Sequence, residues 1–152
     1  MIKKAKMKIV NRKARFNYHF LEKFEAGIVL TGPEVKSIRQ GQISLNDAFV
    51  RIDNNLEAWL INAHIHPYAF ANNSNYEAKR SRKLLLHKKE ILSLLKKMEG
   101  KNLTIVPVSC YLKKQKVKLE LALARGKKTW DKRLAKKKKD LDREIKREMK
   151  RF

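Results

Sequence analysis

The stretch Lys116-Val-Lys-Leu-Glu-Leu-Ala-Leu-Ala-Arg125 alternates apolar and polar side chains over most of its length. Such a period of two predicts a strand with one buried face and one wet face. The buried face would carry Val117, Leu119, Leu121 and Leu123, and the wet face Lys116, Lys118 and Glu120. Residues 103–112 supply a second strand and Lys113-Lys-Gln115 the turn, so the two strands form a hairpin.

More strands are expected toward the N-terminus. Met7 to Ile9 predicts a short strand, and residues 18–31 a longer apolar one in which Gly27 marks a bulge or sharp bend. Asp53-Asn-Asn55 is a turn between strands at 48–52 and 56–65. The second of these strands should carry on one face the side chains of Trp59, Ile61, Ala63 and Ile65.

Three short helical segments and one long loop complete the body. Residues 11–15 could form one turn, and Thr31-Gly-Pro-Glu34 is a helix start, with Gly41 suited to the left-handed end. Residues 84–98 predict a helix that stops at Gly100. Residues 71–82 have no clear period and indicate an exposed loop.

These segments predict a β-dominated α+β fold, with residues 1–125 as an RNA-binding body. The expected architecture is a small antiparallel barrel of about six strands, of the oligonucleotide-binding (OB) type, with two or three flanking short helices. Residues 126–152 form a basic C-terminal tail with thirteen basic and five acidic side chains. Its apolar side chains make one narrow stripe: Leu134, Leu141, Ile145, Met149 and Phe152. So little apolar area cannot offset the cost of ordering, so we expect a conditionally helical tail that folds against a polyanion.

Composition favours a nucleic-acid partner. The formal net charge of +23 opposes compaction and attracts dense negative charge. No apolar run approaches the roughly 20 residues of a membrane span, and the first residues lack the apolar core of a secretory signal. Cys110 is alone, which excludes a disulfide framework and favours a reducing cytoplasm.

The sequence offers no constellation typical of an enzyme. Its five glycines are too scattered for a nucleotide-phosphate loop, and one cysteine cannot complete a zinc set. His64 and His66 would share a strand face, but two ordinary strand histidines explain them better than a metal site. Asp131, Asp140 and Asp142 are surrounded by lysines and indicate solvated helix charges. We therefore expect no catalysis, no cofactor and no metal.

Four basic clusters are spread over the chain, at residues 11–15, 79–83, 113–118 and 127–139. One such run often serves only solubility, whereas four of them, one enclosing Trp130, favour nucleic-acid binding. Two smaller features stay open. Leu84-Leu-Leu86 could be the packing edge of a helix or leave one leucine exposed to a nucleotide, and Glu25 could pair with a lysine or accept from a base edge.

Five segments, taken together, resemble the SsrA-binding protein (small protein B, SmpB) family. They run in family order across nearly the whole chain: Asn11-Arg-Lys-Ala-Arg15, residues 24–39, Asp47-Ala-Phe-Val-Arg51, residues 82–91 and residues 121–133. The resemblance implies an OB-type barrel that binds the tRNA-like domain of transfer-messenger RNA (tmRNA). With alanyl-tmRNA, elongation factor Tu and GTP, members enter ribosomes stalled on messages without a stop codon. The tail would then become a helix in the vacant mRNA channel near the decoding centre.

The resemblance also implies roles for particular residues. Those matching RNA-binding positions are Asn11, Glu25, Arg39, Phe49, Leu85, Lys116, Lys127 and Lys128. Those matching ribosome-contacting tail positions are Trp130, Asp131, Lys132, Arg133, Met149 and Lys150. Trp130 stands where relatives often carry His or Tyr, and Glu77-Ala78 replaces the usual Asp-Pro. A rival hypothesis, a constitutive ribosomal protein that holds rRNA segments together, shares the charge and the tail.

Overall fold

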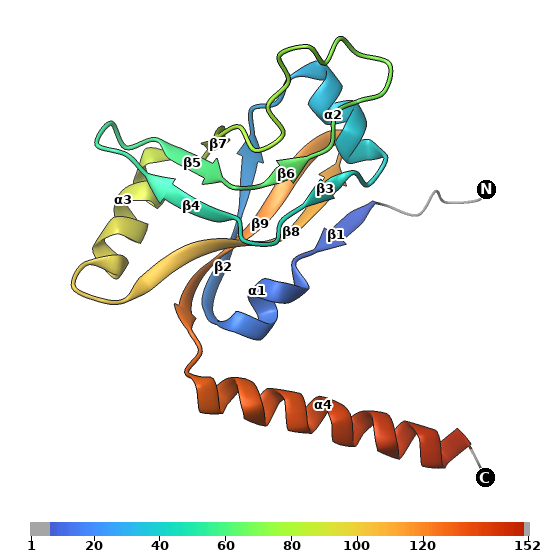
Figure 1. Ribbon diagram of the computed structural model, residues 1–152. Helices are drawn as coiled ribbons and strands as arrows, with labels where there is room; N and C mark the ends of the chain where they lie inside the picture. Colours follow the sequence, from blue (N-terminus) through green and yellow to red (C-terminus); the bar gives the residue numbers. More distant parts are fainter. Residues whose placement is uncertain (1–6, 151–152) are drawn as a thin grey trace.

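The computed structural model describes residues 7–150 of the chain (Figure 1). The expectations that concern Met1 to Lys6 and Phe152 lie outside these described residues. The elements, in chain order, are β1 (Lys8–Val10), α1 (Arg12–Asn17), β2 (Tyr18–Ile28), α2 (Gly32–Arg39), β3 (Ile43–Ser44), β4 (Phe49–Ile52), β5 (Ala58–Ile61), β6 (His64–Ile65), β7 (Arg82–Leu85), α3 (Lys88–Met98), β8 (Leu103–Lys113), β9 (Lys116–Gly126) and α4 (Thr129–Lys150).

Six antiparallel strands close into a ring. The order is β8-β4-β5-β7-β2-β9, and β9 pairs back with β8. The short strand β1 adds to the outside of β8, and β3 pairs with β6 in a separate ribbon. The predicted fold class is therefore confirmed: a small antiparallel barrel with short flanking helices.

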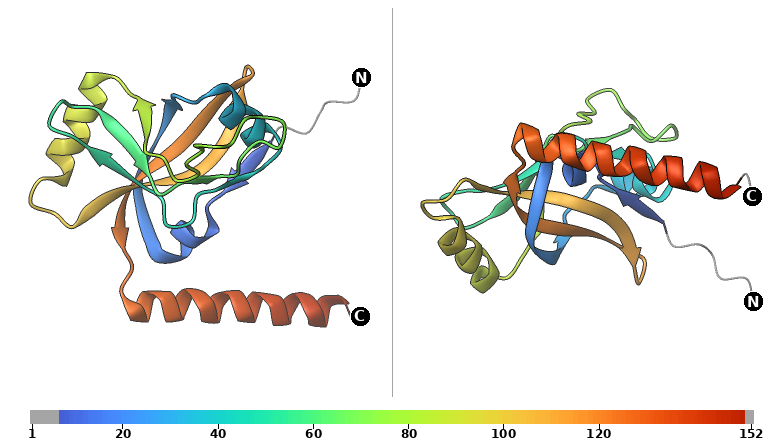
Figure 2. Two further views of the ribbon diagram at one scale, coloured as in Figure 1. Left: turned by 45° about the horizontal axis from the view of Figure 1, so that its top comes forward. Right: turned by 90° about the horizontal axis from the view of Figure 1, so that it is seen from below.

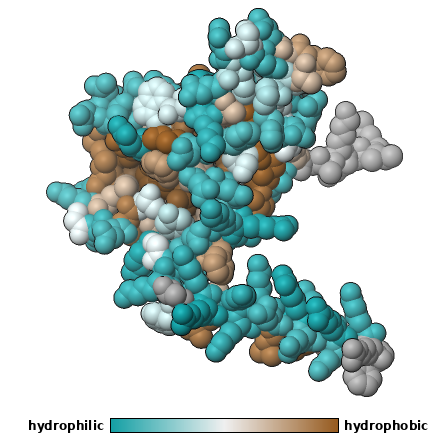
Figure 3. Space-filling model, in the orientation of Figure 1, coloured by the Kyte–Doolittle hydropathy of each residue, from teal (hydrophilic) through white to brown (hydrophobic). Residues whose placement is uncertain are grey.

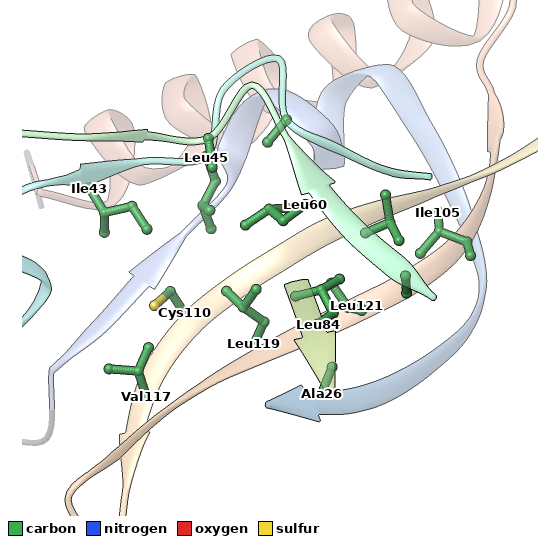
Figure 4. Packing of buried hydrophobic residues seen from close by; sticks show 14 of the residues in the cluster. Ala26, Ile43, Leu45, Leu60, Leu84, Ile105, Cys110, Val117, Leu119 and Leu121 are labelled. Atoms are coloured by element: carbon green, nitrogen blue, oxygen red, sulfur yellow. The ribbon is translucent and has the colours of Figure 1, made fainter. Parts of the chain in front are cut away.

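The ring encloses one apolar core. Figure 4 shows Leu60, Ile105, Leu119 and Leu121 pointing toward one another from β5, β8 and β9. All four side chains are buried, as is Cys110 in the same cluster. The alternation from Val117 to Leu123 therefore follows the inner wall of the barrel, as the sequence predicts.

The central hairpin forms where it is expected, but part of its outer face is covered. Lys114 and Gln115 make the turn with φ of 50° and 66°, a left-handed pair that matches strand twist. At the other end of β9, Ala124 is buried with Ala14 of α1 and Val106 of β8. The wet face thus extends only over the end of β9 near the turn, because α1 closes the other end.

The region of the three leucines corrects one prediction. Residues 82–85 form strand β7, and helix α3 begins only at Lys88. Leu84 is buried in the core, whereas Leu85 points outward and is 56% exposed. A run of three leucines fits a strand or a helix equally well, and here pairing with β2 and β5 decides in favour of the strand.

Two other strand predictions were wrong in detail. The expected strand over 56–65 is divided into β5 and β6 by Asn62, whose φ is 65°. The interruption shifts the inward face from Ala58 and Leu60 to Ala63 and Ile65, so Trp59 and Ile61 do not share the buried face of Ala63. The ladder of β2 is irregular between Phe20 and Glu22, not at the predicted bulge Gly27, which stays in register.

Helix α2 begins as the sequence predicts. The Thr31 hydroxyl accepts a hydrogen bond from the Glu34 amide, and the Glu34 carboxylate accepts one from the Thr31 amide. Gly41 follows the helix with φ of 75°, a conformation that glycine adopts without strain.

The tail forms the single helix α4, which runs alongside the body below α1 (Figures 1 and 2). Its apolar stripe is exposed at Leu134, Leu141, Ile145 and Met149. Figure 3 shows apolar atoms of the tail on the side turned away from the body. Within residues 7–150, no helix combines the length and apolar character that crossing a bilayer requires. The helix is present as expected, and its conditional ordering stays a prediction.

Candidate nucleic-acid interface

The face around Glu25 is an exposed mixture of carboxylates and cations. Glu25 accepts a hydrogen bond from the Tyr111 hydroxyl, and Lys113 Nζ lies 3.4 Å from its Oε1. Across the β2–β9 ladder it stands opposite Glu120, which pairs with Lys23 at 3.6 Å. The Tyr111 hydrogen bond, with Lys113 and Lys118 nearby, lowers the pKa of Glu25. The carboxylate stays ionised and is held by a phenol and a lysine, which is the lysine-pairing alternative of the two left open by the sequence.

Leu85 lies on the same outer face as Glu25. Gly27, two residues beyond Glu25 on β2, is directly opposite Leu85 on β7 and Lys118 on β9. A Cβ at Gly27 would lie 3.2 Å from the Leu85 Cβ, so the absence of a side chain lets Leu85 lie close over β2. The exposed leucine is thereby flanked by a carboxylate and a lysine, a surface on which an unpaired nucleotide could rest.

A groove of about 560 Å³ begins at Leu85 and extends between the β4–β5 turn and the start of α3. Two lysines border it, Lys83 on β7 and Lys88 at the first position of α3. The groove has apolar walls and carries mixed charge, because Glu57 also lines it and pairs with Lys83 at 3.4 Å.

Arg39 and Lys116 meet at the tip of the hairpin. The Arg39 guanidinium at the end of α2 donates to the Gln115 carbonyl oxygen at 3.4 Å, and Lys116 opens β9 beside it. Both side chains are exposed. The tip therefore gathers cations from two distant parts of the chain, and this places a further basic patch at the end of the barrel.

The structure places Asn11 inside the protein, contrary to the expectation of a surface residue. Its side chain is 2% exposed, accepts from the Ala14 amide, and donates to the carbonyl oxygens of Leu45 and Pro107 at 3.0 and 2.9 Å. All its hydrogen-bonding capacity is directed at the protein. Asn11 therefore caps and anchors α1, and direct contact with RNA would fall to the exposed neighbours Arg12 and Lys13.

Phe49 is half-buried on the outer face of β4, opposite Ile61. In the barrel order β4 lies between β8 and β5, away from β2. The structure therefore does not bring Phe49 together with Glu25 and Leu85.

The start of the tail is attached to α1. The Lys127 amide donates to the Asn17 carbonyl oxygen at 2.8 Å, and its Nζ donates to that of Arg15 at 3.1 Å. Asp131 accepts from the Lys128 amide at 3.2 Å and lies 3.5 Å from the His19 ring. Trp130 and Arg133 are exposed and Lys132 half-buried. These residues of the first helical turns are thus gathered beside the body.

Met149 and Lys150 lie at the far end of α4, and both are exposed. The remaining predicted tail residues are near its beginning, so the structure separates the predicted tail site into two parts along one helix.

An ion cluster that sequence reasoning missed lies beneath the long loop. Glu34, 1% exposed, pairs with fully buried Arg82 at 2.5 Å and with Arg80 at 2.6 Å. Arg82 also donates to the carbonyl oxygens of Ala63, Ala78 and Arg80. The predicted basic cluster 79–83 is therefore partly structural. The alternation of β7 from Arg82 to Leu84 was the available signal, because it places Arg82 on the buried face.

The two histidines do not form part of a larger ligand set. Their rings make an edge-on contact with centroids 4.6 Å apart, and burial, with smaller effects of neighbouring charges, lowers the pKa of His64. Across the described residues, no group of three or more His, Cys, Asp or Glu side chains is arranged to hold a metal ion.

Comparison with known proteins agrees with this picture. The SmpB protein family model matches residues 8–151. An SsrA-binding protein of Carboxydothermus hydrogenoformans is 55% identical over 135 residues, covering 89% of this chain and 90% of its own. One of Sulfurihydrogenibium sp. is 52% identical over 145 residues and 95% of each chain. A chain from a solved structure described as "tmRNA-SmpB: a journey to the center of the bacterial ribosome" is 45% identical with a TM-score of 0.66, over 80% of this chain and 85% of that one.

Proposed function

The chain belongs to the SsrA-binding protein (SmpB) family, and from this we propose that it is a tmRNA-binding adaptor of trans-translation. It binds the tRNA-like domain of tmRNA, helps to deliver alanyl-tmRNA to stalled ribosomes, and places its tail in the vacant mRNA channel. The family is one of RNA-binding adaptors and not of enzymes. Family membership over residues 8–151 is the observation that carries the proposal.

The exposed face formed by Glu25, Gly27, Leu85 and Lys118 supports a specific RNA site on the body. Folded RNA is recognised through its phosphates and its unpaired bases, and this face offers cations together with one exposed apolar side chain. The proposed RNA-binding set keeps Arg39, Phe49, Lys116, Lys127 and Lys128, with Asn11 acting by holding α1 in place.

The proposal divides the chain into an RNA-binding body, residues 1–125, and a tail, residues 126–152. The exposed stripe and charged surface of α4 suit a helix that is surrounded by RNA rather than by its own body. Trp130, Asp131, Lys132 and Arg133 would contact the decoding centre, and Met149 and Lys150 the channel. The complex that enters the ribosome would also contain elongation factor Tu and GTP, in the cytoplasm.

The decisive experiment is capture of the protein from a lysate of its own organism, followed by sequencing of the bound RNA. We expect tmRNA to be strongly enriched over bulk tRNA and rRNA fragments, since the proposed site is specific. A random sample of cellular RNA would contradict the proposal.

A charge reversal tests the body face directly. Glu25→Arg should weaken tmRNA binding more than bulk tRNA binding, because it removes the carboxylate that Tyr111 and Lys113 hold. Glu22→Arg is a matched control on the same strand, where Glu22 pairs with Lys97 at 2.6 Å beside α3. Equal losses for both RNAs, or for both variants, would remove the case for a specific site at Glu25.

A high-salt wash of ribosomes distinguishes this function from that of a constitutive ribosomal protein. A rescue factor should be substoichiometric and should leave the ribosome as salt screens its phosphate contacts. A structural protein of the subunit would stay at one copy.

A further inference from the structure

A cationic cleft of about 550 Å³ separates α1 from α4. Arg12 and Arg15 form one wall, Lys139 and Arg143 the other, and Lys127 lies where the two helices approach. Phe16 and Ala135 complete the lining, which contains no carboxylate. Five cations thus face a shared space, an arrangement that is unfavourable unless negative charge enters it.

Apolar packing does not hold α4 in this position. Ala135, Lys139 and Arg143 recur every fourth residue and form the helix face toward α1. The stripe containing Leu141 and Ile145 lies on the other side of the helix and is exposed. The helix therefore presents its charged face to the body and its apolar face to solvent.

In the described part of the chain, the contacts that anchor α4 to the body lie in its first turn and in the segment just before it. Lys127 makes its two hydrogen bonds to α1 carbonyl groups, and Asp131 lies near His19. Among the described residues, no other ion pair joins α4 to the body. Beyond that turn, the two walls of the cleft carry like charges and repel one another.

We infer that this cleft clasps one strand of single-stranded RNA, with phosphates between the two cationic walls and a base against Phe16. Phe16 is 42% exposed, so an unpaired base can stack on its ring. Binding closes α4 against α1, because the phosphates neutralise the repulsion between the walls. The inference rests on the proposed function only in taking RNA as the partner, and it assigns a site separate from the Glu25 face.

The binding test uses a fluorescein-labelled oligouridylate about ten nucleotides long, within the site sizes of single-strand binders. The double variant Lys139→Gln/Arg143→Gln removes the α4 wall. Lys138→Gln/Arg147→Gln removes the same charge from the same helix outside the cleft lining. We expect the cleft variant to bind about tenfold more weakly and its salt slope to fall by roughly 0.7 per cation removed. Equal losses in the two variants, or no binding by the unmodified protein, would overturn the inference.

Phe16 provides a second variant pair. Phe16→Tyr should retain oligouridylate affinity because it keeps an aromatic face, whereas Phe16→Leu should lose about tenfold. Equal affinity in both would show that no base stacks there and would overturn that part of the site.

Closure can be measured separately. Spin labels at Asn46→Cys and Lys146→Cys report the distance between body and α4; buried Cys110, whose pKa burial raises to about 12, will not compete for label. We expect a broad distance distribution alone and a narrow one with oligouridylate. The same narrow distribution without RNA would overturn the clasp. If a protein whose α4 does not close on RNA still bound tmRNA selectively, the clasp would be wrong and the proposed function would stand. Failure of the clasp and failure of the proposed function are therefore distinguishable.

Discussion

Glu34 and Arg82 form a buried ion pair, with Nε of Arg82 2.5 Å from Oε2 of Glu34, between residues 48 apart in the chain. The pair joins the start of α2 to β7, and Arg82 also donates to the carbonyl oxygens of Ala78 and Arg80 in the loop before β7. Since β7 also carries Leu85, this contact connects α2 to a strand of the proposed RNA-binding face.

Glu34→Gln should destabilise the protein by about 3 kcal/mol or more, because it leaves the Arg82 charge buried without its counter-ion. The free energy of unfolding in urea measures this loss. Glu57→Gln breaks the surface pair with Lys83 and should change stability by less than about 1 kcal/mol. A small effect at Glu34 would show that the guanidinium is satisfied by carbonyl groups alone.

The same pair predicts a dependence of stability on pH. Burial pushes the Glu34 pKa upward, but hydrogen bonds from the Thr31 amide, Arg80 and Arg82 outweigh it, and the pKa is lowered from its ordinary value of 4.5. The stabilisation is therefore complete above that value and is lost as pH falls through the lower pKa of the folded protein. Urea titrations between neutral pH and acid should show a shallower decline for Glu34→Gln than for the unmodified chain.

Asn11→Ala should cost about 2–4 kcal/mol, because it removes a helix cap and one donor from each of the buried carbonyl oxygens of Leu45 and Pro107. Thermal unfolding measures the loss. If Asn11 acts by holding α1 in place, the RNA affinity of Asn11→Ala should fall together with its stability. Arg12→Ala should weaken RNA binding while leaving stability nearly unchanged. An Asn11 variant that is fully stable but fails to bind RNA would restore a direct contact.

Gly27→Ala should weaken tmRNA binding while changing stability by no more than about 1 kcal/mol. The new methyl group would press on the Leu85 side chain from 3.2 Å and move it on the exposed face. Gly32→Ala is the matched control, because a Cβ there meets nothing within 4 Å. Filter binding with the tRNA-like domain compares the two, and equal affinities would argue against Leu85 as a contact.

Truncation after Lys128 should leave tmRNA affinity nearly unchanged and abolish peptide tagging on stalled ribosomes. The truncated chain keeps the Lys127 hydrogen bonds to α1, so α1 stays attached to the segment that follows β9. Tagging in a reconstituted translation system is the measurement. Normal tagging by the truncated protein would contradict a role for the tail.

The parts of the fold that were predicted correctly rest on local sequence signals. The capping box of Thr31 and Glu34 and the alternation along β9 each depend on neighbouring residues only, and both are confirmed. The predicted helix over 84–87 was wrong because cross-strand pairing overrides the local pattern. The single strand face predicted for Trp59, Ile61, Ala63 and Ile65 was wrong because the left-handed Asn62 interrupts the strand.

Less of the candidate site than of the fold could be predicted from the sequence. Glu25 and Leu85 come together only through the register that sets Gly27 against Leu85, a contact between distant strands. A basic cluster likewise does not reveal which of its members turns inward. Only the alternation of β7 distinguishes Arg82 from its basic neighbours, and its partner Glu34 is far away in the chain.

The ring of six strands has a consequence for how such a surface can vary. Each strand of the ring pairs with a neighbour on both sides, and the backbone hydrogen bonds of this pairing do not depend on outward-pointing side chains. Outward-facing side chains of the ring can therefore be substituted one at a time with little loss of stability. As the RNA sequence changes during evolution, the protein can therefore change its RNA contacts without altering the barrel.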